Sequence, residues 1–89
     1  VDVEVTDPTE YEKYTALAPA AIANLGGHFL ARGGQAETLE GDWSPNRIVI
    51  IEFESVERAK AWLASDEYAP ALAIRHKNAR SKIIVVEGV

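Results

Sequence analysis

Hydrophobic and polar residues alternate at the start of the chain, as they do in a β-strand with one buried face. Val1, Val3 and Val5 lie on one side and the polar residues between them lie on the other, because successive side chains of a strand point to opposite faces. A strand is therefore predicted over residues 1–6. The chain opens within strand sequence, without an initiator methionine, so this strand is expected to be longer than these residues alone.

A long amphipathic helix is predicted next. Asp7, Pro8 and Glu10 provide an N-cap, a first-turn proline and an acidic third position, which together form a capping box. The apolar residues then recur every three or four positions until a glycine pair ends the pattern; they are Tyr11, Tyr14, Ala18, Ala21, Ile22 and Leu25. Pro19 lies inside the helix and has no N–H to donate, so a kink or break is expected near Thr15–Ala18.

Two strands and a long connection follow. His28–Arg32 has strand character, with His28, Leu30 and Arg32 expected on one face, and the glycine pair after it indicates a bulge or turn. A weaker extended segment is predicted over Gln35–Glu40, before a loop at residues 41–46 that is rich in turn residues.

The strand predicted over Arg47–Phe53 is apolar on both of its faces. One face carries Val49 and Ile51 between Arg47 and Phe53, and the other carries Ile48 and Ile50. This pattern is typical of a central strand that is covered on two sides.

The last third of the chain predicts two shorter helices and a final strand. Ser55 is expected to cap a helix with Trp62 in its apolar stripe, and Ser65 a third helix that begins at Asp66. The residues Lys82–Glu87, rich in Ile and Val, predict the last strand.

The order of these elements predicts one α+β domain over residues 1–89, with a ferredoxin-like β-α-β-β-α-β arrangement and a four-stranded antiparallel sheet. Helices on one sheet face leave the second face of the strand Arg47–Phe53 uncovered. A second copy of the chain is the simplest cover, so we expect a homodimer in which two sheets pack face to face as a dimeric α+β barrel.

Composition narrows the range of partners. The net charge of −5 and the pI near 4.9 oppose binding to nucleic acid or to an anionic membrane. The absence of cysteine suits a cytoplasmic protein, and no membrane span or signal peptide is expected. His28 and His76 stand far apart without ligand spacing, so no metal or other cofactor is expected.

A set of ordered segments resembles a known family. The strings GGHFLARGG, LEGDW, RIVIIEF and SDEYAPALAIR follow one another between Gly26 and Arg75, and with the end of the chain they resemble the domain of unknown function 1330 family along nearly the whole length. The resemblance implies a dimeric α+β barrel. That superfamily includes small cofactor-free oxygenases, isomerases and haem enzymes, but the resemblance implies no reaction for this branch.

Three arginines form the leading candidate site. Arg32, Arg47 and Arg75 carry guanidinium groups, which bind carboxylates and phosphates, so their convergence would hold a small anionic molecule. In a second interpretation each arginine pairs with a nearby acidic residue and only holds strand ends and loops. The acidic candidates for that pairing are Glu40, Asp42 and Glu52.

Other residues suggest weaker roles. Histidine side chains have an unperturbed pKa of about 6.5, which suits a general base. His28 is therefore a candidate for proton transfer, with Glu52 as its partner, although a structural role suits both. Trp43 is a candidate lid or partner contact, or a cap on the core, and Tyr68 a candidate to present its hydroxyl to a cavity. Two functions stay open: an enzyme that acts on a small anionic substrate, and a ligand-binding or structural homodimer without turnover.

Overall fold

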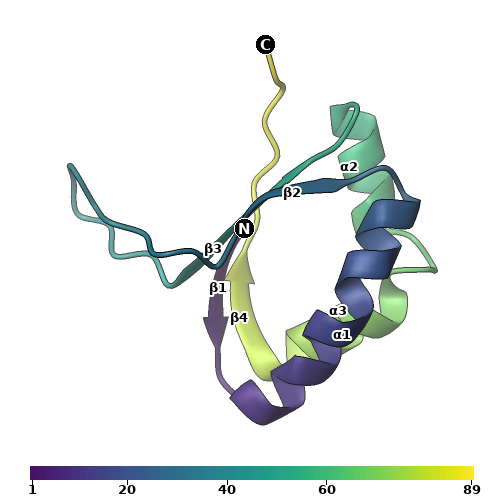
Figure 1. Cartoon of the computed structure of the whole chain (residues 1–89), viewed down its shortest axis with the longest axis horizontal. Coiled ribbons are helices and arrows are strands. Elements are labelled where there is room, and N and C mark those ends of the chain that lie inside the picture. Colours follow the sequence, from purple (N-terminus) through teal and green to yellow (C-terminus); the bar gives the residue numbers. More distant parts are fainter.

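Four strands form one antiparallel sheet with the helices gathered on one side of it (Figure 1). The computed structural model describes all of residues 1–89. Its elements, in chain order, are β1 (Asp2–Val5), α1 (Pro8–Asn24), β2 (His28–Arg32), β3 (Arg47–Glu52), α2 (Val56–Leu63), α3 (Ala69–Asn78) and β4 (Ala79–Lys82). The strand order is β2-β3-β1-β4, and each neighbouring pair is antiparallel.

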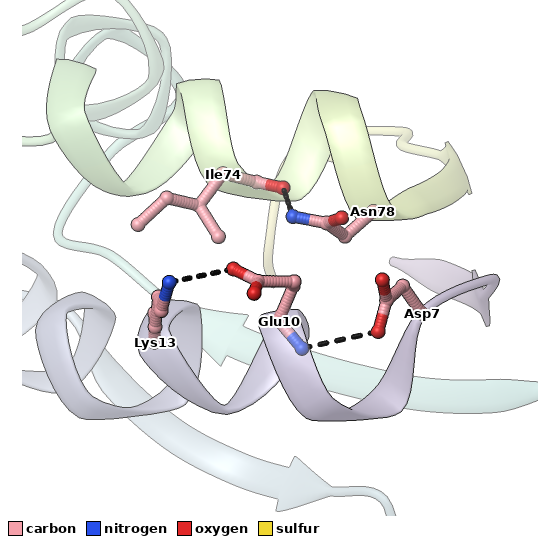
Figure 2. Close-up of polar contacts among 5 residues, drawn as sticks. All are labelled: Asp7, Glu10, Lys13, Ile74 and Asn78. Carbon is pink, nitrogen blue, oxygen red and sulfur yellow. Dashed lines mark hydrogen bonds and ion pairs between the residues drawn. The ribbon is translucent and has the colours of Figure 1, made fainter.

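The start of α1 confirms Asp7 as the N-cap but not the full capping box, because the N–H of Asp7 donates to the carbonyl of Asn78 and not to Glu10. Asp7 has an extended backbone, and its carboxylate accepts a hydrogen bond of 3.2 Å from the backbone N–H of Glu10, whose own carboxylate pairs with Lys13 at 2.7 Å (Figure 2). Of the kink or break expected near Thr15–Ala18, the break is wrong, because α1 continues through Pro19 to Asn24. The proline removes only one helical hydrogen bond, and the exposed position of Thr15 leaves the freed carbonyl to water.

The C-terminal end of α3 is tied to the start of α1. The carbonyl of Asn78 accepts backbone hydrogen bonds from Thr6 at 2.9 Å and from Asp7 at 3.2 Å. The buried side-chain amide of Asn78 in turn donates to the carbonyl of Ile74 at 3.0 Å (Figure 2). These bonds fix the last turn of α3, which carries Arg75.

A β-bulge changes the faces of β2. The register pairs Phe29 with Ile51 but Ala31 with Ile50, so Leu30 is the extra residue. Because a bulge inserts one residue, it reverses the alternation of side chains after it. Arg32 therefore shares the helix-covered face with Phe29, and its predicted place beside Leu30 is wrong.

The connection between β2 and β3 extends away from the rest of the chain (Figure 1). The extended segment predicted over Gln35–Glu40 forms no strand, because no strand of this chain lies beside it to accept a backbone ladder. Leu39 is 89% exposed and Trp43 is 63% exposed. The Thr38 hydroxyl donates to the backbone carbonyl of Trp43, which closes the tip of this connection.

The boundaries of α3 and β4 differ from the prediction. Ser65 accepts a hydrogen bond of 3.1 Å from the N–H of Tyr68, so it caps a turn and α3 starts only at Ala69. The strand β4 spans Ala79–Lys82, not Lys82–Glu87. Its only neighbour is β1, and the ladder between the two strands ends where Asp2 lies opposite Lys82, so the later apolar residues lie beyond this ladder.

The core lies between the sheet and the helices. Its larger cluster comprises the buried residues Ala18, Ala21, Ile22, Trp62, Tyr68 and Ala71, and the smaller one Val3, Tyr11 and Ala79. On the other face of the sheet Leu30 is 63% exposed and Ile50 is 49% exposed. No helix has the length and apolar character needed to cross a membrane.

Candidate functional site

A cavity of about 270 Å³ lies between the sheet and the helices. The strands contribute Val1, Val3, Phe29, Arg32, Arg47, Val49, Ile51 and Ile83 from their inner face or their continuations, and the helical side contributes Tyr11, Tyr14, Thr15, Ala18, Pro19, Ile22, Trp62, Tyr68 and Arg75. The walls are thus mainly aliphatic and aromatic, with the charged groups confined to arginines.

The structure brings the three predicted arginines to this one cavity. Arg32 comes from the end of β2, Arg47 from the start of β3 and Arg75 from α3. None of them forms an ion pair. The ion pairs of the chain join Lys13 to Glu10, Arg58 to Glu54 and Arg80 to Glu4, so Glu40, Asp42 and Glu52 neutralise none of the three cavity arginines.

Arg75 is the most deeply placed of these charges. It is 3% exposed, and its Nε donates a hydrogen bond of 3.3 Å to the Tyr68 hydroxyl. A buried charge without an opposite charge is strongly destabilising, and one hydrogen bond to a phenol offsets only part of that cost. The guanidinium of Arg75 therefore has no anionic partner within the protein.

Arg47 is positioned by the turn that follows β2. Gly33 has a φ of +71°, and a Cβ on this residue would lie only 2.6 Å from Cζ of Arg47. Only glycine combines this left-handed backbone with so close an approach to the guanidinium. The Nε of Arg47 is buried and has no hydrogen-bond partner, so this arginine also keeps an unused donor.

Arg32 differs from the other two because its side chain is exposed. Its Cζ lies 4.7 Å from the centre of the Phe29 ring, a distance at which a guanidinium is attracted to the face of an aromatic ring. The bulge at Leu30 makes this contact possible, since it places both residues on the cavity side of β2. Arg32 thus adds positive charge where the cavity meets solvent.

Tyrosines line the helix side of the cavity. The hydroxyls of Tyr14 and Tyr68 are 2.5 Å apart and share a hydrogen bond. Burial, reinforced by this hydrogen bond, raises the pKa of Tyr14 far above its ordinary value. Burial also raises the pKa of Tyr11, although the nearby charges of Arg47 and Arg75 oppose that rise. Both phenols are therefore neutral hydrogen-bonding groups at neutral pH.

The raised pKa of Tyr14 predicts a loss of stability in alkali. The unfolded chain releases this proton near pH 10 while the folded chain retains it, so the contribution of Tyr14 is fully present below about pH 10 and is lost at higher pH, by at most about 1.4 kcal/mol per pH unit. In urea unfolding between pH 8 and pH 11, Tyr14→Phe is expected to show a shallower decline than the native protein. Parallel declines would contradict the prediction.

Aromatic rings form a continuous row that runs from the cavity wall at Tyr14, Tyr68 and Trp62 to Phe53 in the core. The ring centroids of Trp62 lie 4.5 Å from Tyr68 and 5.3 Å from Phe53, and Tyr68 meets Tyr14 edge to face at 6.2 Å. The indole Nε1 of Trp62 is buried without a hydrogen-bond partner. Such apolar lining suits a ligand that carries a ring.

A family model matches the chain and agrees with the resemblance seen in the segments between Gly26 and Arg75. The model of the domain of unknown function family DUF1330 matches residues 1–89. The chain belongs to the DUF1330 family. Among curated proteins, none matches it.

The remaining predicted residues of this DUF1330 domain lie outside the cavity. His28 and Glu52 are opposite one another in the β2–β3 pair, and both are exposed. Trp43 is at the exposed connection between the same strands. Tyr68, by contrast, is fully buried and lines the cavity.

Sequence reasoning missed two parts of the site. Gly33 was interpreted only as a turn or bulge residue, although its lack of a side chain also makes room for Arg47. Trp62 was assigned to the core alone, yet it also lines the cavity. The tyrosine spacing in α1 did place Tyr11 and Tyr14 on the inner helix face, and that stripe was the available signal for the phenol cluster.

Proposed function

We propose that this DUF1330 domain binds a small anionic, carboxylate-bearing molecule in the cavity between its sheet and its helices. The observation that carries the proposal is that Arg32, Arg47 and Arg75 line one mainly apolar cavity without an acidic partner. Buried charges in folded proteins are normally paired, so an anionic ligand completes this arrangement. Guanidinium groups bind a carboxylate through parallel N–H donors, which gives both affinity and orientation.

Binding without turnover fits the cavity better than proton transfer. No histidine, aspartate or glutamate lines it, and general bases with pKa values near neutrality come mostly from those side chains. Tyr14 is a poor base because its pKa is raised, which keeps it protonated. The candidates His28 and Glu52 are on the exposed face of the sheet, away from the cavity walls.

We further propose that the domain has the ferredoxin-like order and works as a homodimer through its open sheet face. The strand order β2-β3-β1-β4 supports the first statement. Exposed apolar side chains on and beside that face support the second, because monomeric proteins rarely leave such patches uncovered. They are Leu30 and Ile50.

The anion site is tested by replacing Arg47 with glutamine. Arg47→Gln keeps a polar side chain but shortens it and removes the charge, so the affinity for carboxylates is expected to fall by roughly 10- to 100-fold, the value of one or two charge-assisted hydrogen bonds. Isothermal titration with a small carboxylate library measures the change. Arg58→Gln is the matched control, since Arg58 is on the surface beside Glu54, and an unchanged ligand profile for Arg47→Gln would remove the proposal.

A further inference from the structure

The polar groups of the cavity select against cations and zwitterions. The side chains that can hydrogen-bond there are three arginines, three tyrosines, Trp62 and Thr15, and the Thr15 hydroxyl already donates to the carbonyl of Glu12 at 2.9 Å. Guanidinium groups only donate, and no carboxylate is present to pair with an ammonium group. An amino acid would bring a positive charge beside Arg47 and Arg75 without a partner for it.

The size of the cavity suits a ligand of about one ring. An apolar cavity of about 150 Å³ is large enough to hold benzene, so a cavity of about 270 Å³ leaves room for one ring with a short acidic chain. A nucleotide or a lipid chain would extend beyond this volume into solvent. A bare inorganic anion would leave most of the apolar wall in contact with water.

Apolar side chains form most of the remaining cavity lining. Trp62 and Tyr68 stack near one another, and Phe29 and Ile22 line the same cavity. Because contact with these side chains removes apolar ligand surface from water, a ring fits this part of the cavity better than a purely polar anion does.

We infer that the ligand is an aromatic monocarboxylate without an amino group, with its carboxylate at Arg47 and Arg75 and its ring along the wall of Trp62, Phe29 and Ile22. This inference rests on the proposed function and narrows it to one class of anion. Charge at one end and apolar area at the other match the division of the cavity between arginines and rings. Arg32, over Phe29, lies where the cavity opens to solvent.

Phenylacetate is the probe that tests this class, in titration calorimetry on the full chain. Phenylacetate is expected to bind at least tenfold more tightly than L-phenylalanine, acetate or inorganic phosphate. L-Phenylalanine adds an ammonium group, acetate removes the ring, and phosphate keeps only the anion. Benzyl alcohol, which keeps the ring without the charge, is expected to bind at least tenfold more weakly than phenylacetate.

A spectroscopic readout locates the ligand in the native protein. The chain has two tryptophans, so ¹⁵N-labelled protein gives two indole signals, which Trp43→Phe assigns. Phenylacetate is expected to shift the Trp62 signal and leave the Trp43 signal in place. Tighter binding of phosphate, acetate or L-phenylalanine, or an unmoved Trp62 signal, would overturn the inference while leaving anion binding intact; failure of every anion to bind would overturn the proposed function as well.

Discussion

Replacing Arg75 with methionine is expected to stabilise the ligand-free protein by about 1–3 kcal/mol, because exchange of buried charge for an apolar side chain of similar volume is often favourable. Arg75 is 3% exposed and has no acidic partner. The substitution leaves the Tyr68 hydroxyl satisfied, since Tyr14 still bonds to it. The same substitution is expected to weaken carboxylate binding by roughly 100-fold, or about 2.8 kcal/mol.

Urea unfolding and titration calorimetry at one protein concentration measure the two effects separately. Arg58→Met is the control, because Arg58 lies on the surface and its loss is expected to change the free energy of unfolding by less than about 0.5 kcal/mol. If Arg75→Met loses stability, then Arg75 has a structural role that the cavity does not reveal. If it gains stability but keeps its affinity, the anion binds elsewhere.

A gain in the free energy of unfolding together with a loss of carboxylate affinity in Arg75→Met would show that Arg75 serves binding at the expense of stability. In a chain of 89 residues the net free energy of unfolding is small, so the cost of one unpaired buried guanidinium is a large fraction of it. A ligand that binds only the folded state raises the free energy of unfolding by mass action and so offsets this cost. The site is thus expected to be most stable when an anion occupies it, as is typical where binding groups are preorganised.

Much of this fold follows from the sequence, because the local signals are strong. The cap at Asp7, the cap at Ser55 and the two-faced apolar strand from Arg47 each depend on a few neighbouring residues, so the pattern alone indicates them. The convergence of Arg32, Arg47 and Arg75 on one cavity was only one of two open interpretations. The absence of acidic partners is a property of distant segments and becomes visible only in three dimensions.

The errors arise where one element depends on another. Nothing in the sequence of β2 shows that Leu30 is a bulge, because the bulge is a relation between β2 and β3. The end of β4 was misplaced because strand propensity places Lys82–Glu87 in a strand, whereas the backbone ladder follows the residues that β1 offers. The bulge at Leu30 is the reason that Arg32 lies on the cavity face of β2.

Substitution of Ile50 by glutamate is expected to convert a dimer into a monomer. Ile50 lies on the open face of the sheet, opposite Ala31 of β2, and is 49% exposed in the single chain. In a face-to-face dimer the two copies of a negative side chain would be desolvated within an apolar interface, which costs several kcal/mol. The dimer dissociation constant is therefore expected to rise by roughly 100-fold or more.

Sedimentation velocity over a range of concentrations measures this change, and Leu17→Glu is a closely matched control. Leu17 is 47% exposed, nearly the same as Ile50, but it lies on α1, on the helix side of the molecule. A residue outside the interface tolerates the charge, so Leu17→Glu should sediment as the native protein does. A native protein that is monomeric at micromolar concentration, or equal effects of the two substitutions, would show that the open sheet face is not a dimer interface.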